Sequence, residues 1–135
     1  MNKIYKYILF TLFFGLFLYL PDSSLGQGQP VEEISLSIKA GSSKALSSYF
    51  GENVELSING NQGDYSKNQA ELVIRDFFKK FPPSNFDIVH KGKSSNQIQY
   101  FIGSYQSKEI QFRLLIKCKL NKESPRIYAL DINKE

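Results

Sequence analysis

The stretch YSKNQAELVIRDFFKKF, residues 65–81, decides the fold of this chain. Ser66 and Gln69 have the spacing of a capping box, in which the hydroxyl accepts from a backbone N–H and the amide reaches back to the cap. The apolar residues recur with the helical period and form one broad stripe, made of Ala70, Val73, Ile74, Phe77, Phe78 and Phe81. Pro82 and Pro83 end the segment. We therefore predict an amphipathic helix whose phenylalanines need a large apolar partner.

The sequence after this helix can supply that partner, because apolar and polar residues alternate there with the period of a strand. Turn-rich segments separate four such strands, at residues 86–91, 98–103, 109–120 and 126–133. Short turns join antiparallel neighbours. Upstream of the helix we predict a strand at residues 52–59, a short return strand at 64–65, and two helical segments that end at Gly41 and Gly51. These two segments form either one kinked helix or two short ones. This order is typical of an α+β fold, with the N-terminal helices and the central helix on the concave face of a curved, mostly antiparallel sheet.

Strand alternation assigns side chains to the two faces of this sheet. The face toward the helices is predicted to carry Phe86, Ile88, Tyr100, Ile102, Phe112, Leu114, Ile116, Leu130 and Ile132. His90 has the parity of Phe86 and Ile88, so it is expected to point inward as well. The other face is predicted to mix polar residues with Val89, Phe101, Leu115, Ile127 and Ala129. Such a mixed face favours a homodimer through the sheet; the alternative is the ordinary apolar content of a protein surface.

Residues 1–26 have the pattern of a signal peptide. Lys3 and Lys6 form a positive start, residues 7–20 are an uncharged run rich in Phe and Leu, and Ser24-Leu25-Gly26 places small residues at a cleavage site. The apolar run is shorter than the roughly 20 residues that a spanning helix needs. We expect cleavage, a periplasmic or secreted protein with no membrane span, and one domain at residues 27–135. The alternative is an uncleaved N-terminal anchor.

Composition excludes several classes of function. The 17 Lys and Arg residues against 13 Asp and Glu give a net charge of +4, and the basic residues are mostly scattered lysines. A nucleic-acid interface would cluster them, so no nucleic acid is expected as a partner. One histidine and one cysteine cannot build a multi-ligand metal site or an intrachain disulfide. No motif for a cofactor is present, and Cys118 is expected to be a buried apolar residue.

Several local features together resemble the nuclear transport factor 2-like superfamily, also described as SnoaL-like or cystatin-like. They are the Gly-Ser-Ser break in the N-terminal helix, Tyr65-Ser-Lys67, Asp76-Phe-Phe78, Val89-His-Lys-Gly92, Tyr100-Phe-Ile-Gly103 and Phe112-Arg113. More narrowly, residues 30–133 are similar to a family of small exported bacterial proteins of unknown function. The resemblance implies a cone-shaped half-barrel with a pocket at its open end and frequent dimerisation through the sheet. It implies no single activity, because this fold hosts enzymes and binding proteins alike.

Enzymes of this superfamily usually place an Asp or His in the cone as acid or base. The candidates here are His90, whose pKa range suits proton transfer, and Tyr100 on the next strand. The predicted inner face has no carboxylate base. The alternative is that both side chains are structural and hydrogen-bonded to each other or to the backbone. Together with Phe77, Phe78 and Phe112 they are the candidate ligand-binding residues.

Two functions remain open from sequence alone. The first is non-enzymatic binding of a small apolar ligand or of an envelope protein. The alternative is a small-molecule isomerase, lyase or hydrolase that uses the His90–Tyr100 pair. The two differ in one structural feature, which is whether the cone is an open polar-lined cavity or is filled by aromatic side chains.

Overall fold

The computed structural model describes residues 30–121 and 124–135 of the chain. Its elements are α2 (Pro30–Lys39), α3 (Ser43–Ser47), β1 (Phe50–Ile58), β2 (Asn61–Ser66), α4 (Lys67–Lys80), β3 (Asn85–Lys93), β4 (Ile98–Ser107), β5 (Ile110–Lys119) and β6 (Arg126–Lys134). The predicted signal peptide, residues 1–26, lies outside the described residues. Within them, no helix has both the length and the apolar character to cross a membrane.

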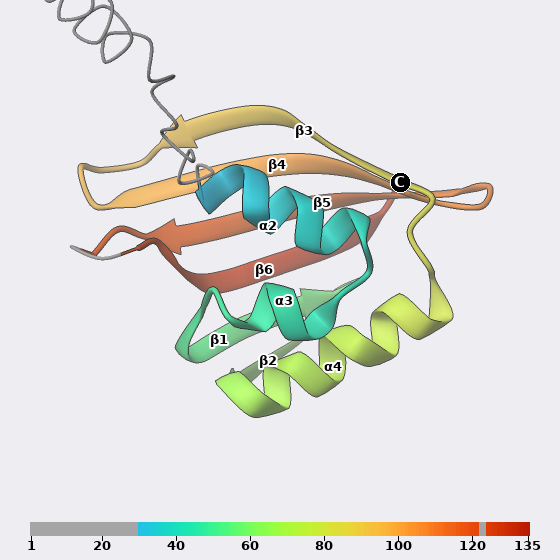
Figure 1. Cartoon of the computed structure of the whole chain (residues 1–135), viewed down its shortest axis with the longest axis horizontal. Helices are drawn as coiled ribbons and strands as arrows, with labels where there is room; N and C mark the ends of the chain where they lie inside the picture. Colours follow the sequence, from blue (N-terminus) through green and yellow to red (C-terminus); the bar gives the residue numbers. More distant parts are fainter. Residues whose placement is uncertain (1–29, 122–123) are drawn as a thin grey trace, which may run out of the picture.

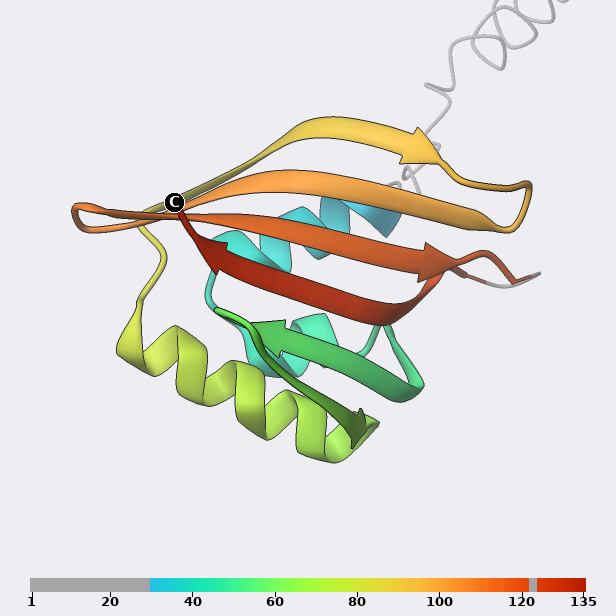
Figure 2. The same cartoon turned by 180° about the vertical axis from the view of Figure 1, so that it is seen from behind.

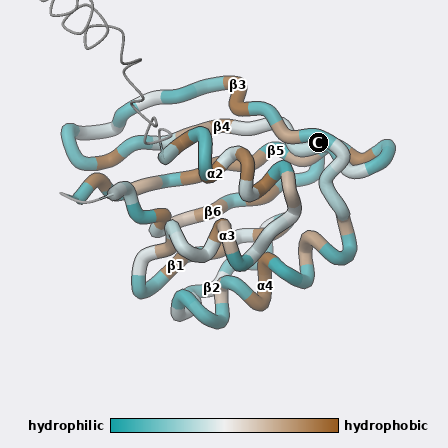
Figure 3. The backbone as a smooth tube through the Cα atoms, viewed as in Figure 1, coloured by the Kyte–Doolittle hydropathy of each residue, from teal (hydrophilic) through white to brown (hydrophobic). Residues whose placement is uncertain are grey.

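The six strands form one curved sheet in the order β2-β1-β6-β5-β4-β3. β1 runs parallel to β6, and every other neighbouring pair is antiparallel. The helices lie on one face of this sheet (Figure 1). The opposite face carries no helix (Figure 2), and we call it the uncovered face. The ends of the β3–β4 and β4–β5 hairpins are hydrophilic (Figure 3). The predicted α+β architecture is confirmed.

Helix α4 forms as the sequence predicts. Ser66 is its N-cap, and the complete capping box with Gln69 is present. Ala70, Ile74, Phe77 and Phe78 are buried, and Val73 and Phe81 pack against the core at its edge. The backbone N–H of Phe81 donates to the carbonyl of Phe77 at 2.8 Å and closes the last turn before the prolines. The cap and the periodic stripe are local features, so the helix can be read from its own residues.

The N-terminal pair of helices breaks where the sequence predicts, but the second helix is shorter. Gly41 has φ +66°, a conformation that suits glycine, and Ser42 caps α3 by accepting from the Ala45 N–H at 3.1 Å. Phe50 was expected on this helix and is instead the first residue of β1. It pairs with Ile127 of the parallel neighbour β6 and is almost fully buried. That pairing joins residues far apart in sequence, and it outweighs the local helical pattern.

The strand faces differ from the predicted ones for two reasons: β-bulges change the alternation in β3 and β6, and β4, whose pairing with β5 is regular, turns the other set of its side chains to the helices. In β3 the register shifts between Ile88 and His90, so Ile88 stays on the helix side while His90 pairs with Ile102 on the uncovered face. In β4 the buried residues are Phe101, Gly103, Tyr105 and Ser107, so Tyr100 and Ile102 belong to the uncovered face. The expectation that His90, Tyr100 and Ile102 point toward the helices is therefore wrong.

The second bulge lies in β6. The pairs Lys117–Ala129 and Cys118–Ile127 leave Tyr128 as an extra residue. As a result Ile127 is fully buried, although strict alternation with Leu130 placed it on the other face. The uncovered face thus loses Phe101 and Ile127, which the sequence assigned to it, and gains Tyr100 and Ile102.

Candidate functional site

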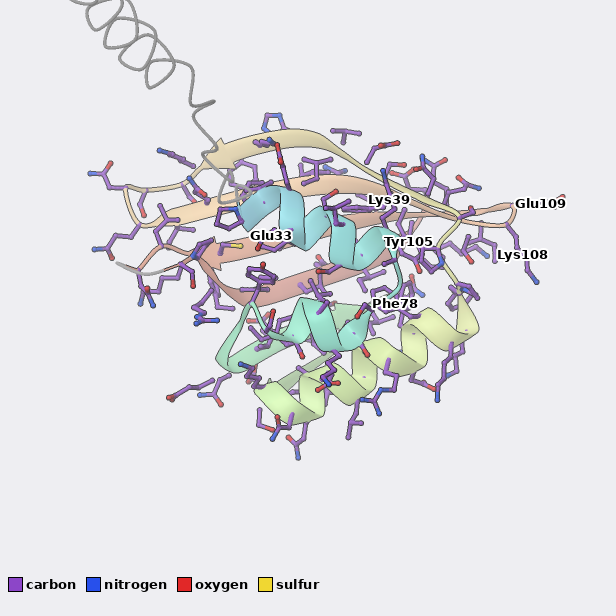
Figure 4. All side chains as sticks on the ribbon, viewed as in Figure 1. Glu33, Lys39, Phe78, Tyr105, Lys108 and Glu109 are labelled. Atoms are coloured by element: carbon purple, nitrogen blue, oxygen red, sulfur yellow. The ribbon has the colours of Figure 1, made fainter. Side chains whose placement is uncertain are left out.

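The interior of the cone is filled by five aromatic side chains, Phe77, Phe78, Phe81, Tyr105 and Phe112, which we call the aromatic cluster. Phe77 is central: its ring centroid lies 5.2 Å from that of Phe112 and 5.5 Å from that of Tyr105. Phe81 closes the group at 5.0 Å from Phe112. Figure 4 shows Phe78 and Tyr105 where α4 meets the sheet, and their rings are stacked. Three candidate ligand-binding residues, Phe77, Phe78 and Phe112, are thus packed against aromatic neighbours.

The one hydroxyl in the aromatic cluster is satisfied. Tyr105 donates to the backbone carbonyl of Phe81 at 2.5 Å, which ties the end of α4 to the middle of the sheet. Burial raises the pKa of the Tyr105 hydroxyl above its ordinary range, so it stays protonated at neutral pH. The hydroxyl is a fixed donor within the packed interior and is not poised for proton transfer.

The His90–Tyr100 pair exists, but on the uncovered face. The Tyr100 hydroxyl lies 3.4 Å from His90 Nε2, and the ring centroids are 5.7 Å apart. His90 is exposed and Tyr100 is half-buried. The Tyr100 ring covers Gly92 so closely that a Cβ at Gly92 would lie 2.3 Å from it. The sequence correctly brought the two side chains together, because both lie on adjacent strands, but the sheet separates them from the aromatic cluster.

A hollow of about 420 Å³ remains on the helix side, where the first turn of α2 meets the ends of β3 and β4. Its walls are apolar or carry lysines and are formed by Pro30, Val31, Lys91, Gly92, Lys93, Gln99, Phe101, Leu120 and Pro125. An adjoining hollow of about 350 Å³ shares Val31 and Lys91 and adds Glu32, Ser35, Leu36 and Ile88. We call the two together the α2 groove. Its size falls in the range of small-molecule sites, roughly 300–1,000 Å³.

Sequence reasoning missed the α2 groove because of the bulge in β3. Strict alternation put Lys91 on the outer face, whereas the shifted register pairs Lys91 with Phe101 and Lys93 with Gln99. Phe101 is buried on the helix side, so both lysines emerge beside the helices. The only signal in the sequence was the pair of lysines two residues apart on one strand, and that pattern is common on surfaces.

Metal-binding side chains and the one cysteine thiol are further candidates for chemistry within the described part of the chain. Within residues 30–121 and 124–135 no three His, Cys, Asp or Glu side chains gather to hold a metal ion. Cys118 is buried, and burial raises the pKa of its thiol to about 12. A thiol with such a pKa is not a nucleophile at neutral pH. This agrees with its expected role as a buried apolar residue.

Comparison with protein families identifies the chain. The profile of DUF4783, a domain of unknown function, matches residues 31–133. The chain belongs to the DUF4783 family. A DUF4783 protein from Bacteroides ovatus superposes with a TM-score of 0.73 at 28% identity, over 76% of this chain and 93% of that chain. Its counterpart from Bacteroides uniformis gives 0.72 at 25% identity, over 77% of this chain and 95% of that chain.

More distant structures describe the fold of this DUF4783 protein. An NTF-2 like protein of unknown function from Silicibacter pomeroyi has a TM-score of 0.57 at 15% identity, over 78% of this chain and 90% of that chain. A domain with a cystatin-like fold from Nostoc punctiforme gives a TM-score of 0.62 at 10% identity, over 78% of this chain and 73% of that chain. No curated protein matches the sequence. The resemblance to the nuclear transport factor 2-like fold is therefore confirmed, and the family brings no activity with it.

Proposed function

We propose that this DUF4783 protein is an exported, non-enzymatic binding protein that holds a small, partly apolar ligand in the α2 groove. One observation carries the proposal: the aromatic cluster fills the cone, and the α2 groove, one of the hollows that remain on the helix side, has mostly apolar walls. Ligand sites are typically apolar clefts with a few polar groups, and the α2 groove has that composition. Export rests on the signal-peptide pattern of residues 1–26, which favours a periplasmic or secreted protein.

The arrangement of the candidate acid–base pair supports binding over catalysis. His90 lies exposed on the uncovered face, and the sheet stands between it and the α2 groove. A proton-transfer site gains strength when water is excluded and its charges are held in a shaped, low-dielectric site. His90 lines a hollow of about 520 Å³ on that face, but its side chain is exposed to water there, so the pair lacks such a setting. An isomerase, lyase or hydrolase that works through His90 and Tyr100 is accordingly the weaker candidate.

A substitution in the groove separates the two functions. Replacing Val31 with aspartate puts a charge on the apolar wall, and we expect the affinity for the ligand to fall about tenfold, which corresponds to about 1.4 kcal/mol, so that less ligand co-purifies. The measurement is native mass spectrometry of the protein purified from its own cell envelope or medium. Val31 is only partly buried, so the variant is expected to fold. His90→Ala is the control and is expected to keep its ligand.

The opposite results would refute the proposal. If His90→Ala releases the ligand and Val31→Asp retains it, the binding site is on the uncovered face and the acid–base alternative gains support. If the unmodified protein carries no ligand and binds none offered to it, the binding function is wrong for the α2 groove.

We further propose that a second copy of the chain covers the uncovered face. Acidic side chains lie on the β2-β1-β6 half of that face, namely Glu55, Asp64 and Asp131, and basic ones on the β5 side, namely Arg113, Lys117 and Lys119. A two-fold axis parallel to the strands, between β6 and β5, would set each half against its complement. Interfaces between identical copies are commonly two-fold and self-complementary in this way.

Charge reversal tests this dimer. We expect Lys117→Glu to weaken dimerisation at least about tenfold, because it places like charges opposite each other. The double variant Lys117→Glu with Asp131→Lys restores complementarity and should restore the dimer. Sedimentation velocity over a concentration series measures both. A single variant that dimerises as well as the unmodified protein, or a monomeric unmodified protein, would refute the interface.

A further inference from the structure

We propose that the ligand of the α2 groove is an amphipathic anion, with one acidic head group at Lys91 and Lys93 and a single apolar chain along the groove. This inference rests on the proposed binding function and adds the class of ligand. Three features of the described residues carry it: two unpaired cations, an apolar wall beside them, and an acidic side chain that sets the direction of the ligand.

The cations have no carboxylate partner in the described part of the chain. Lys91 and Lys93 leave β3 on the same side, two residues apart, and both line the larger hollow. The two ion pairs found among residues 30–121 and 124–135 are Glu71–Arg75 and Asp76–Lys80, both within α4. Among the described residues, no carboxylate forms an ion pair with either ammonium group, so the two lysines present a local positive charge at one rim. An acidic head group supplies the missing charge.

The wall beside these lysines suits an alkyl chain. Val31 lies at one side of the larger hollow, Phe101 forms part of its floor, and Leu120 contributes from the end of β5. Pro30 and Pro125 add further apolar surface without backbone N–H donors. Gln99 is the one uncharged polar side chain in this lining. With so few hydrogen-bonding groups, the hollow favours a ligand whose body is apolar over a sugar or a nucleotide.

Glu32 gives the ligand a direction. It lines the smaller hollow together with Lys91 and is absent from the lining of the larger one. An anion is repelled by Glu32 at the smaller hollow. It is attracted by Lys93, which lines the larger hollow and not the smaller one. The head group accordingly binds between Lys91 and Lys93. Because lysine acts as a point charge and not as a planar fork, a carboxylate and a phosphate ester fit equally.

The test is a ligand titration of the purified protein followed by ¹H–¹⁵N correlation spectra. The probes are decanoate, decyl phosphate, decanol and decyltrimethylammonium, each below its micelle concentration. We expect decanoate and decyl phosphate to bind about tenfold more tightly than decanol, and the cation more weakly still. Shifts should concentrate in residues 31–36, 91–93 and 99–101. A preference for one of the two anions identifies the head group.

Three double variants make the comparison sharp. Lys91→Ala with Lys93→Ala should abolish the tenfold preference for the anions and leave decanol binding unchanged. Lys67→Ala with Lys79→Ala is the control, since it also removes two exposed lysines, but on α4 and outside the lining of the α2 groove. It should keep the preference. Lys91→Gln with Lys93→Gln repeats the test with uncharged polar side chains in place of the ammonium groups, and the same spectra report that each variant is folded.

The outcomes separate this inference from the proposed function. Equal binding of decanoate and decanol, or a preference that survives the loss of both lysines, overturns the anionic class and leaves the binding function standing. Shifts confined to the uncovered face, or no shifts with any probe, overturn both.

Discussion

Replacing Phe112 with alanine is expected to lower the free energy of unfolding by about 3–5 kcal/mol. Phe112 is fully buried, and its ring contacts Phe77, Phe81 and Tyr105 at centroid distances of 5.2, 5.0 and 6.0 Å. Removing the ring costs both the burial of its apolar surface and the packing of three aromatic neighbours around the cavity left behind. Urea unfolding, followed by far-ultraviolet circular dichroism, measures the loss.

The control for this variant is an exposed apolar residue of the neighbouring sheet edge. Val89 lies at the bulge of β3 with 65% of its surface exposed, so Val89→Ala should change the free energy of unfolding by less than about 0.5 kcal/mol. A loss below about 1 kcal/mol for Phe112→Ala would mean that the cone is loosely filled. In that case the interior, and not the α2 groove, would become the first place to look for a ligand.

Alkaline pH is the second large effect that we expect. Burial raises the pKa of the Cys118 thiol from 9.0 to about 12, and it raises the pKa of the Tyr105 hydroxyl as well. The pKa of Tyr49 rises to about 12 through burial, its hydrogen bond to Glu33 and the charge of that carboxylate. In all three cases the folded state holds its proton more tightly than the unfolded state. The stabilisation is therefore complete below pH 9 and is lost as the pH rises toward 12.

The size of the alkaline effect follows from linkage. At a pH roughly 1.5 units above the ordinary value of the Cys118 thiol, this group alone lowers the free energy of unfolding by about 2 kcal/mol. Urea unfolding at pH 8 and pH 10.5 gives the difference. Cys118→Ala serves as the comparison, because it lacks the titrating group; its stability should fall less over the same interval. If the free energy of unfolding falls equally in both proteins between pH 8 and pH 10.5, the thiol does not contribute to the alkaline loss of stability.

The main helix was predictable because each of its determinants is local. The capping box of Ser66 and Gln69, the apolar stripe and the prolines lie within about 20 residues, and α4 begins and ends where they indicate. The same holds for the break at Gly41 and for the antiparallel hairpins after α4. The α+β class followed from the order of these elements, and so did the resemblance to the nuclear transport factor 2-like fold.

The faces of the strands were not predictable to the same degree. Alternation correctly placed Phe112, Leu114, Ile116 and Cys118 of β5 in the core, because that strand contains no bulge of its own. The bulge at Val89 has no signature within β3, since it arises from the pairing with β4. One extra residue turns every following side chain to the other face. This is why His90 moved outward while Lys91 moved toward the helices.

By itself, the sequence determined the helix of residues 67–80, the class of the fold and the closeness of the His90 and Tyr100 side chains. These features depend on neighbours along the chain or on adjacent strands. Only the tertiary structure decided which face of the sheet the His90 and Tyr100 side chains occupy. It packed Phe77, Phe78 and Phe112 against Tyr105 and so filled the cone. It also opened the α2 groove beside Lys91 and Lys93. The physical reason is that strand register depends on partners distant in sequence, and a shift of one residue exchanges core and surface.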